Sequence, residues 1–367
     1  MRVALVSKAC LVGSYQRKLE ELAALPDIEL AVIVPPAWRD ERGEVRLERA
    51  HLAGYRLVVE PILFNGNYHL YFFPSIGRLL TVFRPDVLHI DEEPYNFAAY
   101  HLLRVAKRLK AKTVFFAWQN LNRRYPFPFN RMERAVLRGS DACIAGNHDS
   151  AQVWRSKGFV GPTAIIPQFG VDPDLYVPRE VDRPVFTIGY VGRFVEEKGP
   201  NLLVQAAARL PGDWRLEMVG SGPMQGALHA LVDRLDLRDR VTFRPWMPSA
   251  QLPWLYPTFD VLVLPSRAKP TWKEQFGRAL IEAMACGVAV VGSSCGEIPH
   301  VIGEAGLVFP EGDVGALGSC LERLMRDSDL RRDLISRGRQ RVLEHYTQKQ
   351  VAAATAEVYR ALLTQAA

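Results

Sequence analysis

The length and composition of the chain exclude several classes of protein. Its 367 residues, 48% of them hydrophobic, indicate two domains of ordinary size. The 23% of charged residues is typical of soluble domains and argues against disorder, collagen and a charged coiled coil. Because no uncharged stretch is long enough for a membrane helix or a signal-peptide core, we expect a cytoplasmic protein.

Five cysteines lie singly along the chain. They are odd in number and form no C-x-x-C pair, which disfavours a disulfide framework and a zinc site. They are Cys10, Cys143, Cys286, Cys295 and Cys320. We therefore expect reduced, mostly buried thiols.

The net charge of +6 is concentrated in the first half of the chain. Residues 1–183 contain 25 Lys and Arg against 20 Asp and Glu, whereas the remainder is nearly balanced. Such an excess could attract nucleic acid, anionic lipid or a phosphorylated small molecule. The charge alone does not choose among these partners.

Short apolar runs, each followed by an amphipathic stretch, recur in two series. This pattern is typical of strand–helix units and predicts an α/β protein with two doubly wound parallel sheets. The runs are residues 3–7, 30–34, 87–90, 113–117 and 142–145, then 185–191, 216–219, 261–264 and 288–291.

A proline-rich segment, residues 167–184, separates the two series and is the predicted linker. It divides the chain into a domain at 1–175 and a domain at 184–345. We expect a final helix, about residues 348–367, to cross back to the first domain.

Two glycine turns follow the first two strands of the second series. Gly192-Arg193 leads to Lys198-Gly199, and the two bases match a pair of linked phosphates. Gly220-Ser221-Gly222 fits neither the dinucleotide fingerprint nor the P-loop, which argues against a nicotinamide dehydrogenase or a P-loop ATPase. For the segment with Arg193 and Lys198, the alternative is an ordinary strand–helix turn in which the two basic side chains are simply solvated.

Two glutamates frame a predicted apolar helix over residues 278–286. Glu274 precedes this helix and Glu282 lies within it, eight positions later and roughly on the same face. Glu274 could accept hydrogen bonds from sugar hydroxyls, and Glu282 could hold a diol such as a ribose. The alternatives are a helix-start acid for Glu274 and a solvent-facing glutamate for Glu282.

These motifs occur in one order: G-R-x(4)-K-G, V-G-x-G-P, E-x-F-G, E-x(7)-E and G-x-I-P. The pattern resembles the nucleotide-sugar-binding half of the retaining family 4 glycosyltransferases, the glycosyl transferases of group 1. The resemblance implies the GT-B fold, with two Rossmann-like domains facing a central cleft. It implies that Arg193 and Lys198 hold a diphosphate, Glu274 the donor sugar and Glu282 the ribose.

The resemblance also implies a wider set of site residues. The catalytic candidates are Glu274, Arg193 and Lys198. The donor-binding candidates are Gly13, Gly192, Gly220, Gly222, Arg244, Trp246, Gln275, Phe276, Gly277 and Glu282. No metal and no cofactor are implied.

The sequence departs from the family pattern at two places. The usual glycine pair before Ile-Pro is Gly296-Glu297, and the usual following acid is His300. Many relatives carry a histidine where this chain has Gln119 and Asn120, which do not exchange protons near neutral pH.

Gln119 or Asn120 could still donate a hydrogen bond to a sugar, and further residues are candidates for the acceptor side. His89 precedes the acidic run 91–93, where crowding could raise one pKa enough for base chemistry, although a hydrogen-bonded turn is the alternative. The acceptor-side candidates are Asp91, Glu92, Gln119, Asn120, Arg123 and Arg124.

The function expected from the resemblance is the transfer of a hexose from a nucleoside-diphosphate sugar to a hydroxyl of a sugar, lipid-linked or other acceptor. The enzyme would retain the anomeric configuration, need no metal and serve polysaccharide, glycolipid or glycoconjugate biosynthesis. The alternatives are a nucleotide-sugar epimerase of the same fold and a non-catalytic sugar-nucleotide-binding assembly protein. The basic first half suggests an anionic acceptor or a peripheral contact at the inner membrane face, and no nucleic-acid partner is expected.

Overall fold

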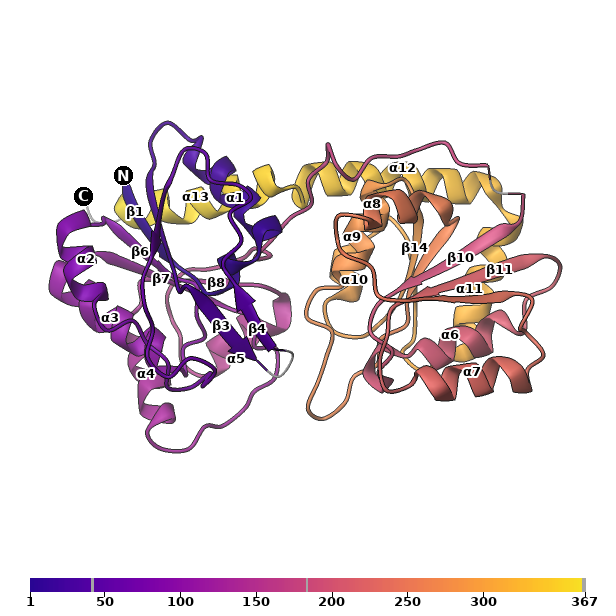
Figure 1. Ribbon diagram of the computed structural model, residues 1–367, viewed down its shortest axis with the longest axis horizontal. Helices are drawn as coiled ribbons and strands as arrows, with labels where there is room; N and C mark the ends of the chain where they lie inside the picture. Colours follow the sequence, from indigo (N-terminus) through magenta and orange to yellow (C-terminus); the bar gives the residue numbers. More distant parts are fainter. Residues whose placement is uncertain (41–42, 183, 365–367) are drawn as a thin grey trace. The chain divides into compact units, whose positions relative to one another are not determined.

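The chain forms two compact units (Figure 1). The computed structural model describes residues 1–40, 43–182 and 184–364. Unit 1 comprises Met1–Gly170 and the segment from Gln348 onward, and unit 2 comprises Val171–Thr347. The chain therefore passes from one unit to the other twice, and most of the proline-rich segment belongs to unit 2.

Unit 1 is built on a seven-stranded parallel sheet in the order β5-β2-β1-β6-β7-β8-β9. Its central strands are continuous buried runs, as expected for a sheet covered on both faces. The strands are β1 (Arg2–Val6), β2 (Glu29–Val34), β5 (Arg56–Val59), β6 (Val87–Ile90), β7 (Lys112–Ala117), β8 (Ala142–Ala145) and β9 (Thr163–Ile165). A separate antiparallel hairpin joins β3 (Ala37–Asp40) to β4 (Gly43–Arg46).

Helices cover both faces of this sheet and enclose two apolar cores. One core contains side chains of α1 (Gly13–Ala23) and α13 (Gln348–Thr364). The other is covered by α2 (Ile76–Phe83), α3 (Phe97–Leu109), α4 (Phe129–Gly139) and α5 (His148–Ser156). A short 3-10 turn, η1 (Ala9–Leu11), precedes α1.

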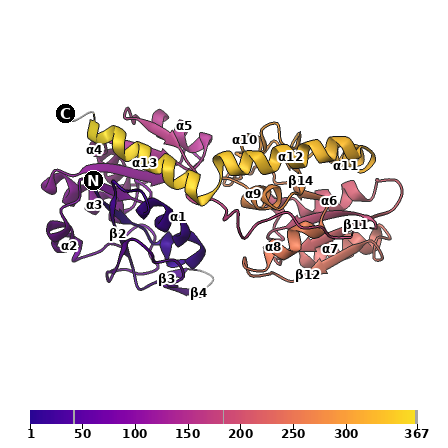
Figure 2. The same cartoon turned by 90° about the horizontal axis from the view of Figure 1, so that it is seen from above.

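The last helix, α13, completes the core of unit 1. It packs against α1 and β8, and Figure 2 shows it beside α1. Tyr359 of α13 is fully buried, and its hydroxyl lies 2.6 Å from Nδ1 of His89 on β6. Burial lowers the pKa of His89 to about 4, so this histidine is a neutral core residue at neutral pH.

Unit 2 contains a six-stranded parallel sheet in the order β12-β11-β10-β13-β14-β15. The prediction of two doubly wound parallel sheets is therefore confirmed. The strands are β10 (Phe186–Val191), β11 (Trp214–Val219), β12 (Val241–Arg244), β13 (Val261–Leu264), β14 (Ala289–Ser293) and β15 (Leu307–Phe309).

The helices of unit 2 also form two layers. One core is covered by α6 (Pro200–Ala207), α7 (Gln225–Arg234) and α11 (Val314–Arg326). The other is covered by α8 (Leu252–Leu255), α9 (Arg278–Ala285) and α10 (Ile298–Ile302), and α12 (Ser328–His345) contributes to both. Two 3-10 turns complete the unit, η2 (Glu196–Lys198) and η3 (Tyr256–Thr258). Within the described ranges, no helix is both long and apolar enough to cross a membrane.

The strand order reverses once in each sheet, between β1 and β6 in unit 1 and between β10 and β13 in unit 2. In open α/β sheets, ligands bind beyond the carboxyl ends of the strands at such a reversal. The segments that follow β1, β6, β10 and β13 are therefore the places to look for functional residues.

We expect Tyr359→Ala to destabilise the protein by about 3–5 kcal/mol, because it empties a fully buried aromatic position. Tyr359→Phe keeps the ring and removes only the hydrogen bond to His89, so its cost should be about 1 kcal/mol. Urea unfolding measures both values. Glu357→Ala, at an exposed position of the same helix, is the control. Equal stabilities of Tyr359→Ala and Glu357→Ala would show that α13 does not complete the core.

Candidate functional site

The loop that follows β10 packs closely against the segment that follows β13. It contains η2 and reaches Gly199, whose φ of 61° lies in the left-handed region. A Cβ atom at Gly199 would lie only 2.1 Å from the carbonyl oxygen of Pro265, so this close approach requires glycine. The two strand ends of the reversal in unit 2 thus share one site.

A lysine and a glutamate meet at this site. Nζ of Lys198 lies 2.6 Å from Oε2 of Glu274, whose side chain is buried. The hydroxyl of Ser266, two residues after β13, donates to the same oxygen over 2.7 Å. The ring of Trp272 lies 5.1 Å from Nζ of Lys198. The arrangement places a cation and a hydrogen-bond acceptor side by side at the strand ends.

Glu282 is held inside unit 2 rather than facing solvent. Its side chain is 3% exposed, the hydroxyl of Tyr256 donates to Oε2 over 2.7 Å, and Nε of Arg278 donates to Oε1 over 2.6 Å. The helix α9 that carries it begins after Gly277, which has a φ of 84°. The solvent-facing alternative for Glu282 is therefore wrong.

The two glycine turns adjoin each other through backbone hydrogen bonds. The amide of Phe194 donates to the carbonyl of Ser221 over 2.9 Å, and the amide of Gly220 donates to the carbonyl of Arg244 over 3.1 Å. The candidates Gly192, Gly220 and Gly222 thus lie in neighbouring loops after β10 and β11, and Arg244 is the last residue of β12 beside them.

The remaining donor-side candidates differ in their exposure. The side chains of Arg193 and Gln275 are exposed, and Trp246 is 67% exposed. The guanidinium of Arg244 pairs with Glu217 over 2.9 Å. Phe276 is half-buried.

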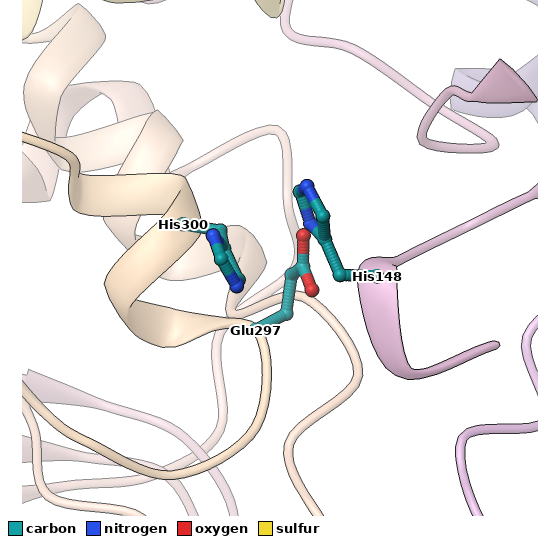
Figure 3. A group of neighbouring side chains, drawn as sticks. All are labelled: His148, Glu297 and His300. Atoms are coloured by element: carbon teal, nitrogen blue, oxygen red, sulfur yellow. The ribbon is translucent and has the colours of Figure 1, made fainter. Parts of the chain in front are cut away.

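The glycine that the chain keeps at position 296, before the departure at Glu297, has a local structural reason. Gly296 has a φ of 57°, and a Cβ atom there would lie 2.1 Å from the carbonyl oxygen of Glu274. The amide of Glu297 donates to that same oxygen over 3.2 Å. Figure 3 shows the side chains of Glu297, just before α10, and of His300 within it. This turn therefore fixes the backbone of Glu274.

Unit 1 has a cavity of about 300 Å³ at its own reversal of strand order. It lies at the segments that follow β1 and β6 and also receives residues from the β3–β4 hairpin. The lining residues are Lys8, Ala9, Leu11, Val12, Tyr15, Trp38, Val45, Tyr68, Asp91, Glu92, Glu93, Phe116, Trp118 and Gln168. The structure thus brings the predicted Asp91 and Glu92 together in one cavity.

Asp91 and Glu92 each have partners within unit 1. Asp91 accepts hydrogen bonds from the hydroxyl of Ser7 and from Nε2 of Gln168, the latter over 2.8 Å to Oδ1. Glu92 forms an ion pair with Lys8 and accepts a hydrogen bond from Nδ2 of Asn96 over 3.2 Å.

Glu93 is the titratable group of this cavity with the most altered acidity. Burial raises its pKa to about 7, and the charge of Glu92 adds a smaller effect in the same direction. Its Oε1 accepts the backbone amides of Trp118 and Gln119 over 2.8 and 3.1 Å. Crowding of acids was expected to raise one pKa here, but burial is the larger cause.

The other acceptor-side candidates do not line the cavity. Gln119 is buried. Its side-chain Nε2 donates to the carbonyl of Leu121 over 3.0 Å, and its Oε1 accepts from the hydroxyl of Tyr125 over 2.5 Å. Asn120 is buried, whereas Arg123 and Arg124 are exposed. 

Gly13 begins α1, and its amide donates to Oε2 of Glu48 over 2.5 Å. A ligand at Gly13 would have to displace this carboxylate. His148, also drawn in Figure 3, is the exposed first residue of α5.

Several site residues were not predicted from the sequence. Ser266 follows the buried run 261–264 by two positions, a placement that could have marked it. Gln168 lies at the start of the proline-rich segment, and its side chain bridges Asp91 and Nε1 of Trp118. Trp38 comes from the β3–β4 hairpin, which no motif indicates.

The architecture is that of solved glycosyltransferases of the GT-B class. Sucrose-phosphate synthase from Thermosynechococcus elongatus matches with a TM-score of 0.73 and 22% identity over 100% of both chains. HepE from Anabaena, solved in complex with UDP, matches with a TM-score of 0.73 and 18% identity over 98% of this chain and 99% of that one. At these identities the likeness shows the GT-B fold alone.

Sequence comparison gives the family. The model for glycosyl transferases group 1 matches residues 179–341, and the model for glycosyltransferase family 4 matches residues 17–175. The chain belongs to this glycosyltransferase family, as the motifs around Lys198 and Glu274 predict.

Two relatives illustrate how far the similarity extends. D-inositol 3-phosphate glycosyltransferase of Mycobacteroides abscessus is 34% identical over 212 residues, which are 52% of this chain and 46% of that protein. Putative colanic acid biosynthesis glycosyltransferase WcaL of Escherichia coli is 26% identical over 296 residues, 78% of this chain and 73% of that protein. The match thus spans less than half the length of the first relative.

The raised pKa of Glu93 predicts a pH dependence of stability. Between its ordinary value of 4.5 and about 7, the folded protein holds a proton that the unfolded chain has released. The free energy of unfolding should therefore fall as the pH rises through this range, by up to about 3 kcal/mol.

The variant Glu93→Gln should lose this pH dependence, because its amide oxygen can still accept the two backbone amides without titrating. Urea unfolding of wild type and variant at pH 5, 6, 7 and 8 measures the difference. Glu304→Gln, at an exposed position, is the control. A constant stability difference between Glu93→Gln and wild type across this range would contradict the prediction.

Proposed function

We propose that this protein transfers a hexose from a nucleoside-diphosphate sugar to an acceptor hydroxyl, with retention of the anomeric configuration and without a metal ion. The observation that carries the proposal is the contact of Lys198 with Glu274 at the reversal of strand order in unit 2. A cation beside a buried carboxylate suits a ligand that joins a phosphate to a sugar.

The proposed donor site assigns a task to each group. Lys198 and Arg193 would bind the diphosphate, and Glu274 would accept hydrogen bonds from hydroxyls of the donor sugar. Glu282, fixed by Tyr256 and Arg278, would hold the ribose hydroxyls. The remaining donor contacts are assigned to the backbone of 275–277, to the glycines 13, 192, 220 and 222, and to Arg244 and Trp246 for the base.

The proposed reaction exchanges one bond for another at the anomeric carbon. The bond between that carbon and the diphosphate oxygen breaks, and the leaving diphosphate takes the electron pair. The acceptor oxygen then bonds to the same face of the sugar, and its proton passes to a phosphate oxygen. The positive charges of Lys198 and Arg193 would stabilise the diphosphate as its negative charge grows. No protein base is required by this scheme, which agrees with Gln119 and Asn120 in place of a histidine.

The relatives suggest which donor and pathway to test first. HepE from Anabaena was solved in complex with UDP-glucose, so uridine diphosphate sugars come first. The name of the Escherichia coli relative refers to colanic acid biosynthesis, which supports a role in the synthesis of a polysaccharide or glycoconjugate.

The variants Lys198→Ala and Glu274→Gln should each lower donor turnover by about 100-fold or more, because each removes a group that binds the reacting part of the donor. The measurement is the release of nucleoside diphosphate from UDP-, GDP-, ADP- and TDP-hexoses, by hydrolysis when no acceptor is added. Thermal shifts with the same panel identify the donor beforehand.

Lys349→Ala, which changes an exposed lysine of α13, is the matched control. Circular dichroism and thermal unfolding should show that all the variants are folded. Wild-type turnover in both Lys198→Ala and Glu274→Gln would refute the assignment of the donor site. Proton NMR of the product, which reports the anomeric configuration, tests retention separately.

A further inference from the structure

We propose that the cavity of unit 1 binds an uncharged sugar or polyol, so that the acceptor ring of the transfer carries no phosphate. This inference rests on the proposed function where it names the bound sugar as the acceptor. It reverses the expectation of an anionic acceptor that the basic first half of the chain raised.

The cavity is built as a small-molecule site. It lies at the reversal of strand order between β1 and β6, where ligands of such sheets bind, and its volume of about 300 Å³ is at the lower end of the range for ligand pockets. Trp38, Tyr68 and Trp118 contribute aromatic side chains to its lining. Flat aromatic surfaces beside a few polar groups suit a sugar ring, which has apolar C–H faces and a polar edge.

The charge of the lining disfavours a phosphate. Among the described residues that line the cavity, one is cationic, Lys8, and three are acidic, Asp91, Glu92 and Glu93. A phosphate group would meet the carboxyl groups of Asp91 and Glu92, and like charges repel. Glu93, whose pKa burial raises to about 7, adds only part of a charge at neutral pH.

The one cation of this lining is engaged by its neighbours. The ammonium of Lys8 pairs with Glu92 and donates to the hydroxyl of Tyr71 over 3.2 Å. It also lies 4.6 Å from the ring of Tyr68 and 5.5 Å from the ring of Trp38. A phosphate would have to compete with Glu92 for this ammonium. Lys198 of unit 2 is paired with Glu274 in the same way, so what sets this cavity apart is its further acids, Asp91 and Glu93.

Two of the acids have a buried oxygen without a partner. Glu92 and Glu93 are 3% and 8% exposed, and Oε1 of Glu92 and Oε2 of Glu93 have neither a hydrogen-bond partner among the described residues nor contact with solvent. A ligand hydroxyl would reach these oxygens only after the side chain turned toward the cavity. Buried acceptors without partners are costly, so such a turn would supply hydrogen bonds that they lack.

The basic residues expected to attract an anion lie elsewhere. Arg123 and Arg124 are exposed and are not part of the cavity lining. The net positive charge of residues 1–183 therefore does not predict the charge of the cavity lining, which has more acidic than basic residues.

The test compares matched pairs of ligands on the full-length protein without a donor: glucose, galactose and mannose, each with its 6-phosphate. Saturation-transfer NMR measures the dissociation constants. Binding is assigned to the cavity only where Trp38→Ala removes it. Val45→Trp, which fills the cavity from the same hairpin, serves as a second variant should Trp38→Ala fail to fold.

We expect at least one neutral sugar to bind in the cavity, and its 6-phosphate to bind about tenfold more weakly or worse. Glu92→Gln leaves Lys8 without its carboxylate partner, so this variant should narrow or reverse the preference. A 6-phosphate that binds the wild-type cavity as tightly as its neutral sugar would overturn the proposal. So would the absence of cavity binding by all three neutral sugars.

The same experiments separate this inference from the proposed function. Donor hydrolysis requires the Lys198–Glu274 site and no acceptor, whereas the sugar titrations require the cavity and no donor. Hydrolysis without neutral-sugar binding would refute only the inference. Neutral-sugar binding without turnover of any donor would refute only the proposed function.

Discussion

Both candidate sites depend on one topological constraint, the reversal of strand order in a parallel sheet. Crossover connections between parallel strands are right-handed, so the connections on the two sides of a reversal leave toward opposite faces of the sheet. The strand ends at that point are then not covered by a connecting helix. In unit 1 this happens between β1 and β6, and in unit 2 between β10 and β13. The polar side chains of each candidate site lie at these strand ends because no connecting helix covers them.

The two units use the same topology for different chemistry. In unit 2, close approaches that only glycine permits, at Gly199 and Gly296, hold the backbone around a lysine–glutamate contact. In unit 1, three acids and several aromatic side chains surround a cavity in which Lys8 is already paired. Under the proposed function, the first site would take the charged donor and the second an uncharged acceptor.

The sequence predicts the central parts of this fold better than its edges. Runs such as 261–264 are uniformly apolar because they are buried on both faces, and their positions in the structure agree closely with the prediction. Edge strands such as β12 alternate with exposed polar residues and give no such signal. Lys198 and Glu274 belong to motifs of fixed spacing and could be singled out, whereas their contact could not. Gln168 and Trp38 reach the cavity of unit 1 only through tertiary packing, so no local pattern marks them.

The packing of α13 affects the order in which the protein can be completed during synthesis. Tyr359 fills the core of unit 1, yet it is made after the whole of unit 2. Unit 2 is continuous in sequence, whereas unit 1 needs a segment that is made after unit 2. The domain that is begun first is therefore the one that is finished last. Until then its sheet exposes the apolar surface that α13 will cover, and the nascent chain must be kept from aggregating.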